Sequence, residues 1–451
     1  MAIENTNFKL DEIHNFFTNA KRIFFIGIGG ISMSSLATYC VYLGKEVFGY
    51  DRTRSRVTKK LEKICNIKYY STPDNVSCMD MVIFTGAIDE SNFEYKRANE
   101  LKIPTISRAN FLGYIISRYK TKIGVSGMHG KSTTCALITH IFDYASRNPT
   151  SFCGAEMKLY DSACLIKKGQ CCIFEACEYM NSFLSLPCDD AVILNIDFDH
   201  PDFFKSLDDI KCSFNKFANK AKRVFINADD EASTSIVAKE KITFGIKSEA
   251  MYKAKIIHSP DFYGFEVYKN GALLGKCKST FFGEHFIYDA LCAFSVASEN
   301  NIAPSVICGA ISSFMGSERR MELIKKTDTG APVFMDYAHH PTEIKASLCA
   351  LLEMGYKKIL CVFQSHTYSR TFFLYDEFTK AFEDASKLVI LPIYSAREEN
   401  IYEITDEGFA RDCGGIFLQD LCATSSYIKN CECDCVVIMG AGDIYKLVKF
   451  L

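Results

Sequence analysis

The chain has 451 residues, of which 48% are hydrophobic and 24% are charged, and its formal net charge at pH 7 is −2. A chain of this length is too long for one hydrophobic core, and we expect about three domains. The composition is ordinary for a globular protein, and the near-zero charge argues against a general nucleic-acid-binding surface.

Neither a secretion signal nor a membrane anchor is expected. The first ten residues carry charges and contain no apolar signal core, and no run approaches the ~20 apolar residues of a membrane span. We therefore expect a cytoplasmic protein without membrane insertion. The 21 cysteines are scattered through the chain, and we interpret them as reduced, buried thiols.

Residues 1–119 begin with a predicted βαβ unit. A strand at residues 22–28 leads into a glycine-rich turn, a helix at 32–43 follows, and a second strand at 46–50 ends at Asp51. Such a turn binds a phosphate or diphosphate at the start of its helix. The candidate ligand-binding residues of the turn are Gly27, Gly29 and Gly30.

The turn does not identify the molecule that carries the phosphate. Ser32 stands where a dinucleotide-binding fingerprint has its third glycine. Asp51 is equally well explained as a ligand contact or as a surface carboxylate at the end of a strand. A strand at residues 79–85 and a helix at 90–101 continue the alternation of strands and helices that is typical of an α/β domain.

The second segment, residues 120–323, opens on the most informative stretch of the chain. Residues 123–134 read Ile-Gly-Val-Ser-Gly-Met-His-Gly-Lys-Ser-Thr-Thr. Backbone N–H groups and the helix dipole at such a turn attract phosphate oxygens. Lys131 would reach the terminal phosphates, and the hydroxyl of Ser132 or Thr133 would bind Mg²⁺. The turn itself contributes Gly127, His129 and Gly130.

This loop departs from the strict phosphate-binding pattern, because Val125 occupies the position of its first glycine. It has the shorter form Gly-x-x-Gly-Lys-Ser. The alternative interpretation is a plain glycine-rich turn between a strand and a helix.

Polar residues follow two further predicted strands. Glu175 follows a strand at residues 171–174, and His200 closes an acidic stretch after a strand at 191–196. Ligands bind at the carboxyl ends of parallel strands, so both side chains are candidates for catalysis and metal binding. Mg²⁺ prefers oxygen ligands, and a histidine there indicates a second metal position or a role toward the substrate. Taken singly, each is also explained as a strand-end carboxylate or a hydrogen-bonded loop histidine.

The rest of this segment predicts a small antiparallel patch and two helices. Residues 251–282 alternate in polarity and contain Asn270-Gly271, a hairpin signal. The helices are expected at residues 284–299 and 304–314.

Residues 324–451 predict a second nucleotide-binding-like α/β domain. The expected elements are strands at 333–335, 358–363, 388–392 and 435–439, helices at 342–353 and 371–385, and a terminal helix. The fold class is therefore α/β with three domains. An N-terminal Rossmann-like domain precedes a central P-loop ATPase-like parallel sheet with its antiparallel patch, and a C-terminal Rossmann-like domain follows.

Several stretches together resemble one family. They are Phe25-Ile-Gly-Ile-Gly-Gly-Ile-Ser-Met-Ser, Gly127–Thr134, Glu175-Ala-Cys-Glu, Asn195-Ile-Asp-Phe-Asp-His200, Asp336-Tyr-Ala-His-His-Pro-Thr-Glu343, Tyr368-Ser-Arg-Thr371 and Met439-Gly-Ala-Gly-Asp-Ile-Tyr-Lys446. They span almost the whole chain in the family's order. The chain thus resembles the Mur ligases, and most closely those that add L-alanine.

The resemblance implies an N-terminal domain for a UDP-sugar, a central ATPase domain and a C-terminal domain that closes over the site. The implied reaction joins L-alanine to the lactyl carboxylate of UDP-N-acetylmuramate, with ATP and Mg²⁺, through an acyl phosphate. It would serve peptidoglycan precursor synthesis. We expect a monomer or weak homodimer.

The resemblance also implies roles for individual residues. Lys131 and a Mg²⁺ ion on Ser132 or Thr133 and Glu175 would stabilise the transferred phosphoryl group, and His200 would hold a second metal. Arg370 would pair with the carboxylate of alanine. The remaining implied contacts are His285 on the adenine side, and Tyr337 and His339 in the amino-acid pocket.

Four positions depart from the family pattern and keep alternatives open. Phe286 and Asp289 replace asparagines of the adenine segment, Cys177 replaces an aspartate, and Thr367 replaces an arginine. The alternatives are a related muramyl ligase with another amino acid or peptide acceptor, and a non-catalytic protein that binds nucleotide or UDP-sugar.

Cys431, Cys433 and Cys435 form a Cys-x-Cys-x-Cys run. Zinc binding is one interpretation, but no fourth ligand stands at the usual spacing. Structural thiols or a mobile loop are the favoured interpretation.

Overall fold

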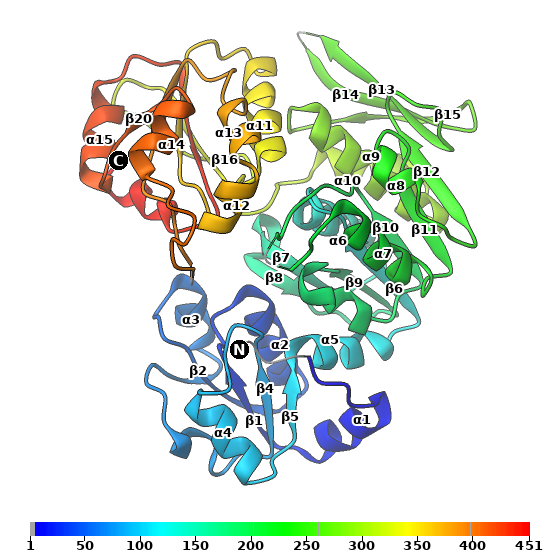
Figure 1. Cartoon of the computed structure of the whole chain (residues 1–451). Helices are drawn as coiled ribbons and strands as arrows, with labels where there is room; N and C mark the ends of the chain where they lie inside the picture. Colours follow the sequence, from blue (N-terminus) through cyan, green and yellow to red (C-terminus); the bar gives the residue numbers. More distant parts are fainter. Residues whose placement is uncertain (1–4, 202, 260, 397) are drawn as a thin grey trace.

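The computed structural model describes residues 5–201, 203–259, 261–396 and 398–451. Its strands form three sheets that follow one another along the chain (Figure 1). The N-terminal domain (blue) and the C-terminal domain (yellow to red) both adjoin the central domain (cyan to light green). Within the described ranges, no helix is both long enough and apolar enough to cross a membrane.

The first sheet contains β1 (Arg22–Ile26), β2 (Glu46–Tyr50), β3 (Asn66–Lys68), β4 (Met81–Phe84) and β5 (Thr105–Ser107). All are parallel, in the order β3-β2-β1-β4-β5. This order places the buried β1 at the centre, with the glycine-rich turn at its carboxyl end. The helices of this domain are α1 (Leu10–Asn19), α2 (Ile31–Tyr42), α3 (Arg56–Leu61), α4 (Phe93–Glu100) and α5 (Arg108–Ser117), with a 3₁₀-helix at Pro73–Val76.

The second sheet has ten strands. They are β6 (Thr121–Ser126), β7 (Thr150–Met157), β8 (Ser162–Leu165), β9 (Cys171–Glu175), β10 (Asp190–Ile193), β11 (Arg223–Asn227), β12 (Lys241–Gly245), β13 (Tyr252–Ser259), β14 (Phe262–Lys269) and β15 (Ala272–Lys278). Their order is β15-β14-β13-β12-β11-β10-β6-β9-β7-β8. The strands from β13 to β7 pair in parallel, and both edges are antiparallel. The strand β6 therefore lies between β10 and β9.

Helices cover this sheet, and the hydrophobic core lies between the two layers. The helices are α6 (Lys131–Tyr144), α7 (Leu207–Ala218), α8 (Glu231–Thr234), α9 (Glu284–Glu299) and α10 (Pro304–Ser312), with 3₁₀-helices at Lys158–Tyr160 and Tyr179–Ser185. The α6 helix begins directly after the phosphate-binding loop and packs against α9.

The third sheet contains β16 (Glu322–Lys326), β17 (Pro332–Asp336), β18 (Ile359–Phe363), β19 (Lys387–Ile390), β20 (Ile416–Phe417) and β21 (Cys435–Met439). Their order is β16-β17-β21-β18-β19-β20, and only the edge strand β16 is antiparallel. The helices are α11 (Pro341–Glu353), α12 (Tyr368–Phe373), α13 (Tyr375–Thr379), α14 (Asp406–Asp412) and α15 (Leu421–Asn430), with a 3₁₀-helix at Ile444–Lys449.

These sheets confirm the predicted α/β fold class with three domains. The antiparallel patch is also present as β13, β14 and β15, and Asn270-Gly271 forms the turn between the last two. The predicted limits of the domains, at residues 119/120 and 323/324, stay predictions. The strand β16 begins at Glu322, so the second limit falls inside an element of the third sheet.

The expected terminal helix is present as a 3₁₀-helix. Two other expectations were wrong. The chain breaks at Leu374 into α12 and α13 instead of forming one helix over 371–385, and Leu374 and Phe378 are both buried there. Cys277 on β15 and Cys308 on α10 form a disulfide, so not every cysteine is a free thiol.

We expect the Phe183→Ala variant to be less stable than the wild type by about 3–5 kcal/mol, because a fully buried ring would be lost. Phe183 stacks on Phe217 at 4.8 Å between ring centroids and meets Phe214 edge-on at 5.3 Å. The measurement is thermal unfolding followed by circular dichroism. Phe93→Ala is the matched control because that ring is 57% exposed; an equal loss in both variants would contradict this packing.

Candidate active site

The phosphate-binding loop connects β6 to α6. Gly130 has a φ of 80°, which favours glycine, and a Cβ atom there would collide with the carboxylate of Asp289. The Lys131 ammonium folds over the loop and donates hydrogen bonds to the carbonyl oxygens of Gly127 (2.6 Å) and Met128 (3.0 Å). The loop thus combines a lysine with the backbone of a helix N-terminus, as a phosphate site requires.

A buried carboxylate neutralises this lysine. The Glu178 side chain is 1% exposed, and its oxygens lie 3.1 Å from Lys131 Nζ and 3.2 Å from His200 Nε2. Burial alone would raise the pKa of Glu178, but Lys131, and after it His200, lowers it. Burial alone would lower the pKa of Lys131, but Glu178 raises it. Both groups are therefore held in their charged forms.

Ser132 and Glu175 meet at the edge of the loop. The Ser132 hydroxyl donates a hydrogen bond to Glu175 Oε2 at 2.8 Å, and the Gly154 N–H donates to the same oxygen at 2.9 Å. A hydroxyl and a carboxylate beside Lys131 are oxygen ligands that suit Mg²⁺. Of the three predicted metal ligands, the structure brings these two together, and it places His200 against Glu178 instead.

Asn195, after the end of β10, ties the loop to the neighbouring strand. Its side-chain oxygen accepts a hydrogen bond from the His129 N–H at 2.8 Å, and its Nδ2 donates to the His129 carbonyl at 3.1 Å. The His129 ring points toward the C-terminal domain, with Nδ1 3.3 Å from Glu343 Oε1 and Nε2 3.6 Å from Asp197 Oδ2. Burial alone would lower the pKa of His129, but these carboxylates raise it to about 9.

A buried ion pair joins the central and C-terminal domains. Arg370 at the start of α12 donates hydrogen bonds from Nε and Nη2 to the two oxygens of Asp199, at 2.9 and 3.3 Å. Both side chains are at most 7% exposed. Burial alone would raise the pKa of Asp199, but Arg370 holds it well below its usual range. The predicted carboxylate-binding arginine is therefore engaged by a carboxylate of this chain.

Tyr337 and His339 follow β17 in the same interdomain region. The Tyr337 ring lies under two guanidinium groups, those of Arg319 at 4.8 Å and Arg320 at 5.0 Å. His339 Nδ1 is 3.0 Å from the Tyr337 carbonyl. Burial lowers the pKa of His339 to about 3, so its imidazole is neutral at physiological pH.

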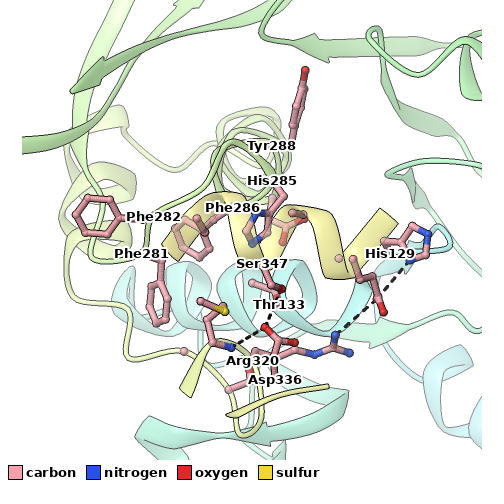
Figure 2. Close-up of a pocket in the computed structure, with 18 of the residues that line it drawn as sticks. His129, Thr133, Phe281, Phe282, His285, Phe286, Tyr288, Arg320, Asp336 and Ser347 are labelled. Carbon is pink, nitrogen blue, oxygen red and sulfur yellow. Dashed lines mark hydrogen bonds and ion pairs between the residues drawn. The ribbon is translucent and has the colours of Figure 1, made fainter. Parts of the chain in front are cut away.

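A cavity of about 660 Å³ adjoins the phosphate-binding loop and continues toward α9. Gly130 and Thr133 of the loop line it together with His285. Figure 2 shows Phe281 and Phe282 toward one end of the cavity and His129 toward the other, with His285 between them. Phe286 lies on the same side of His285 as Phe281 and Phe282, and Tyr288 lines the cavity apart from these three rings. Burial lowers the pKa of His285 to about 4, so its imidazole is neutral at physiological pH.

The glycine-rich turn of the N-terminal domain is shaped by Asp51. One oxygen of this carboxylate accepts a hydrogen bond from the Gly29 N–H at 2.9 Å, and the other accepts from the Thr53 N–H at 3.1 Å. A Cβ atom on Gly29 would lie 2.7 Å from Asp51 Oδ2, so a side chain there would have to displace this carboxylate. Gly27 has a φ of 80°. Asp51 therefore orders the turn, whatever it contacts in addition.

Sequence reasoning missed several residues that complete these contacts. Glu178, Asp199 and Glu343 belong to the quoted motifs, but the motifs do not indicate that each of them pairs with a predicted site residue. Arg108 carried no signal; it donates a hydrogen bond to Ser32 Oγ at 3.1 Å, beside the N-terminal glycine turn. Its position depends on packing of α5 against the first sheet, which no local pattern encodes.

Three family models match the chain in succession. The model described as Mur ligase family, catalytic domain, matches residues 22–120; Mur ligase middle domain matches 125–297; and Mur ligase, glutamate ligase domain, matches 319–442. The UDP-N-acetylmuramate–L-alanine ligase of Caldanaerobacter subterraneus is 38% identical, and that of Acetivibrio thermocellus 39%. These alignments cover 96% and 95% of this chain, and 97% and 94% of the relatives. The chain belongs to the Mur ligase family.

Solved structures agree with this assignment and confirm the resemblance predicted from the motifs. The UDP-N-acetylmuramate–alanine ligase MurC of Thermotoga maritima matches with a TM-score of 0.83 and 26% identity, over 95% of this chain and 98% of that one. A murein peptide ligase of Psychrobacter arcticus matches with a TM-score of 0.75 and 20% identity, over 95% and 97% of the two chains. The second match shows the shared Mur ligase fold alone.

We expect Asp199→Asn to weaken docking of the C-terminal domain of this Mur ligase by about 3–5 kcal/mol, because it leaves the buried Arg370 charge without its counter-charge. Small-angle X-ray scattering would record a larger radius of gyration for the variant. Asp412→Asn is the matched control, because Asp412 pairs with an arginine that is 79% exposed, and such surface pairs contribute little to stability. Identical scattering of Asp199→Asn and wild type would contradict this role.

Proposed function

We propose that this chain is an ATP-dependent ligase that joins the amine of L-alanine to the lactyl carboxylate of UDP-N-acetylmuramate, as a step of peptidoglycan precursor synthesis. The observation that carries the proposal is the agreement of near-full-length relatives, named UDP-N-acetylmuramate–L-alanine ligases, with an intact phosphate-binding loop. The amide product, ADP and phosphate account for all atoms of the substrates.

The chemistry explains why the site needs both a cation and a phosphate-binding loop. A carboxylate is a poor acylating agent, and transfer of the γ-phosphoryl group of ATP converts it to an acyl phosphate that an amine can attack. Negative charge on the phosphoryl oxygens must be stabilised during that transfer. Lys131 is the cation nearest the loop backbone, and Glu178 keeps it oriented there.

Mg²⁺ would be held by Ser132 and Glu175, whose oxygens already face one another at 2.8 Å. When bound, it would neutralise the phosphate oxygens of ATP beside Lys131. His200 would hold a second metal ion. Its Nε2 lies on Glu178, so a metal-binding role requires the imidazole to exchange that carboxylate for the ion.

The nucleotide base would occupy the aromatic end of the cavity, because His129, Gly130 and Thr133 place the phosphates at the other end. The aromatic rings and neutral His285 provide stacking surface for a base. Phe286 contributes packing where an asparagine would offer hydrogen bonds, so base recognition would rest mainly on shape and stacking.

The amino acid would bind in the C-terminal domain near Tyr337, His339 and Arg370. Arg370 already shares its Nε and Nη2 groups with Asp199, and its Nη1 donates to the His366 carbonyl at 3.1 Å. The carboxylate of alanine would therefore displace Asp199 from Arg370 or share the guanidinium group with it. Substrate binding would thus be coupled to docking of the two domains.

The UDP-sugar would bind to the N-terminal domain. Gly27, Gly29 and Gly30 have no side chains to obstruct the start of α2, and a diphosphate would accept hydrogen bonds from that helix N-terminus. Asp51 would support this turn through Gly29. Cytoplasmic location and a monomeric or weakly dimeric state both remain predictions.

The first test measures phosphate release from ATP by the purified protein with UDP-N-acetylmuramate, Mg²⁺ and a panel of amino acids and short peptides. We expect turnover with L-alanine and a product whose mass equals both substrates minus water. Turnover with another acceptor alone would identify a different muramyl ligase. Ligand binding without turnover for any acceptor would identify a non-catalytic protein.

The second test uses Lys131→Ala. We expect kcat for ligation to fall by at least about 10²–10³, since a charge that stabilises the phosphoryl oxygens would be lost. Titration calorimetry should show nearly unchanged UDP-N-acetylmuramate binding, because the two sites lie on different domains. Lys222→Ala, at a side chain 78% exposed on the same domain, is the control. Retained ligation in Lys131→Ala would show that Lys131 is misassigned.

A further inference from the structure

Three side chains from separate elements converge next to the phosphate-binding loop. They are His129 of the loop, Asp197 after β10 and His340 at the start of α11, and one ligand atom from each lies within 4.8 Å of the others. The two rings lie 4.6 Å apart, and His340 Nδ1 is 3.9 Å from Asp197 Oδ2. Ligand atoms of a tetrahedral site are about 3.3 Å apart for bonds of about 2.0 Å, so small side-chain rotations suffice.

The His129 ring is held in a fixed orientation. Its Nδ1 lies 3.3 Å from Glu343 Oε1, and this contact turns Nε2 toward Asp197. A carboxylate on one nitrogen of a histidine, with the other nitrogen facing a ligand cluster, is the usual arrangement around protein-bound metals.

Both rings also have a nitrogen without a hydrogen-bond partner. His129 Nε2 and His340 Nε2 are buried and make no hydrogen bond with any described residue. The His340 side chain is 4% exposed, and its Nδ1 accepts a hydrogen bond from the Thr342 N–H at 3.3 Å. A buried polar atom without a hydrogen bond costs about 1–3 kcal/mol. His129 Nε2 has only its 3.6 Å ion pair with Asp197, so a further group that binds to these nitrogens would be favourable.

We propose that His129, Asp197 and His340 bind a divalent transition-metal ion, which links the phosphate-binding loop to the C-terminal domain. Two imidazole nitrogens and a carboxylate suit Zn²⁺, Co²⁺ or Mn²⁺ better than Mg²⁺. The site is separate from Ser132 and Glu175. His129 and Asp197 also line the cavity, so a water molecule or a phosphate oxygen can complete the coordination. The site does not depend on which amino acid the enzyme uses.

The test titrates Co²⁺ into the metal-free full-length protein without nucleotide, under reducing conditions. We expect visible d–d bands from at least one Co²⁺ ion bound per protein. The near-ultraviolet charge-transfer band of a thiolate ligand should be absent. This distinction is needed because the chain carries 21 cysteines. Absence of the d–d bands, or their appearance only with the thiolate band, would overturn the proposal.

Four variants locate the ion. Substitution of a residue that hydrogen-bonds to a metal ligand weakens metal binding by about 10–100-fold. We expect that loss in Glu343→Gln, because Glu343 contacts His129, and a larger loss in His340→Gln. His366→Gln, at a half-buried histidine of the same domain, and Glu175→Gln should keep the bands. Bands that disappear in Glu175→Gln but persist in His340→Gln would place the ion at the magnesium position and overturn the proposal. Anomalous scattering at the cobalt edge from wild-type crystals gives the position without any substitution.

Discussion

The pairing of buried charges is the constraint on which this structure depends. Lys131 and Glu178 lie at the carboxyl ends of adjacent strands, and neither could remain ionised in that position without the other. Because a buried pair tolerates little displacement, it holds the phosphate-binding loop against the strand end that carries Glu175. The geometry for phosphoryl transfer is therefore a consequence of electrostatic pairing within the central sheet, and the loop sequence alone does not produce it.

The same constraint extends across the domain boundary. Asp199 and Arg370 come from different domains, yet each is buried only because the other is present. Thr342 Oγ1 donates a hydrogen bond to Asp197 at 3.1 Å across the same boundary. These contacts bring the start of α11 over the phosphate-binding loop. Polar contacts such as these can be exchanged when the domains open, which suits an enzyme that must admit three substrates and then exclude water.

Much of the fold follows from sequence because its signals are local. The phosphate-binding loop, the hairpin at Asn270-Gly271 and the helix over 284–299 each carry their pattern within a few residues. The break at Leu374 could not be predicted, since the apolar period continues through it and only tertiary packing favours two short helices. Glu178 and Asp199 were equally hidden: a carboxylate in a motif does not reveal which cation it neutralises until strands and domains are assembled.

The departures from the family pattern near the base pocket are accommodated by packing. Phe286 is 3% exposed and its ring lies 4.9 Å from that of Phe281. Asp289 accepts a hydrogen bond from the Thr134 hydroxyl at 3.0 Å. Burial raises the pKa of Asp289 to about 7, so this side chain is partly neutral and is closer in charge to the asparagine that it replaces. Phe286 is thus packed against another ring, and Asp289 has a hydrogen-bond partner. Since Lys131 and its partners are intact, these changes alter how the base is held and give no physical reason for loss of phosphoryl transfer.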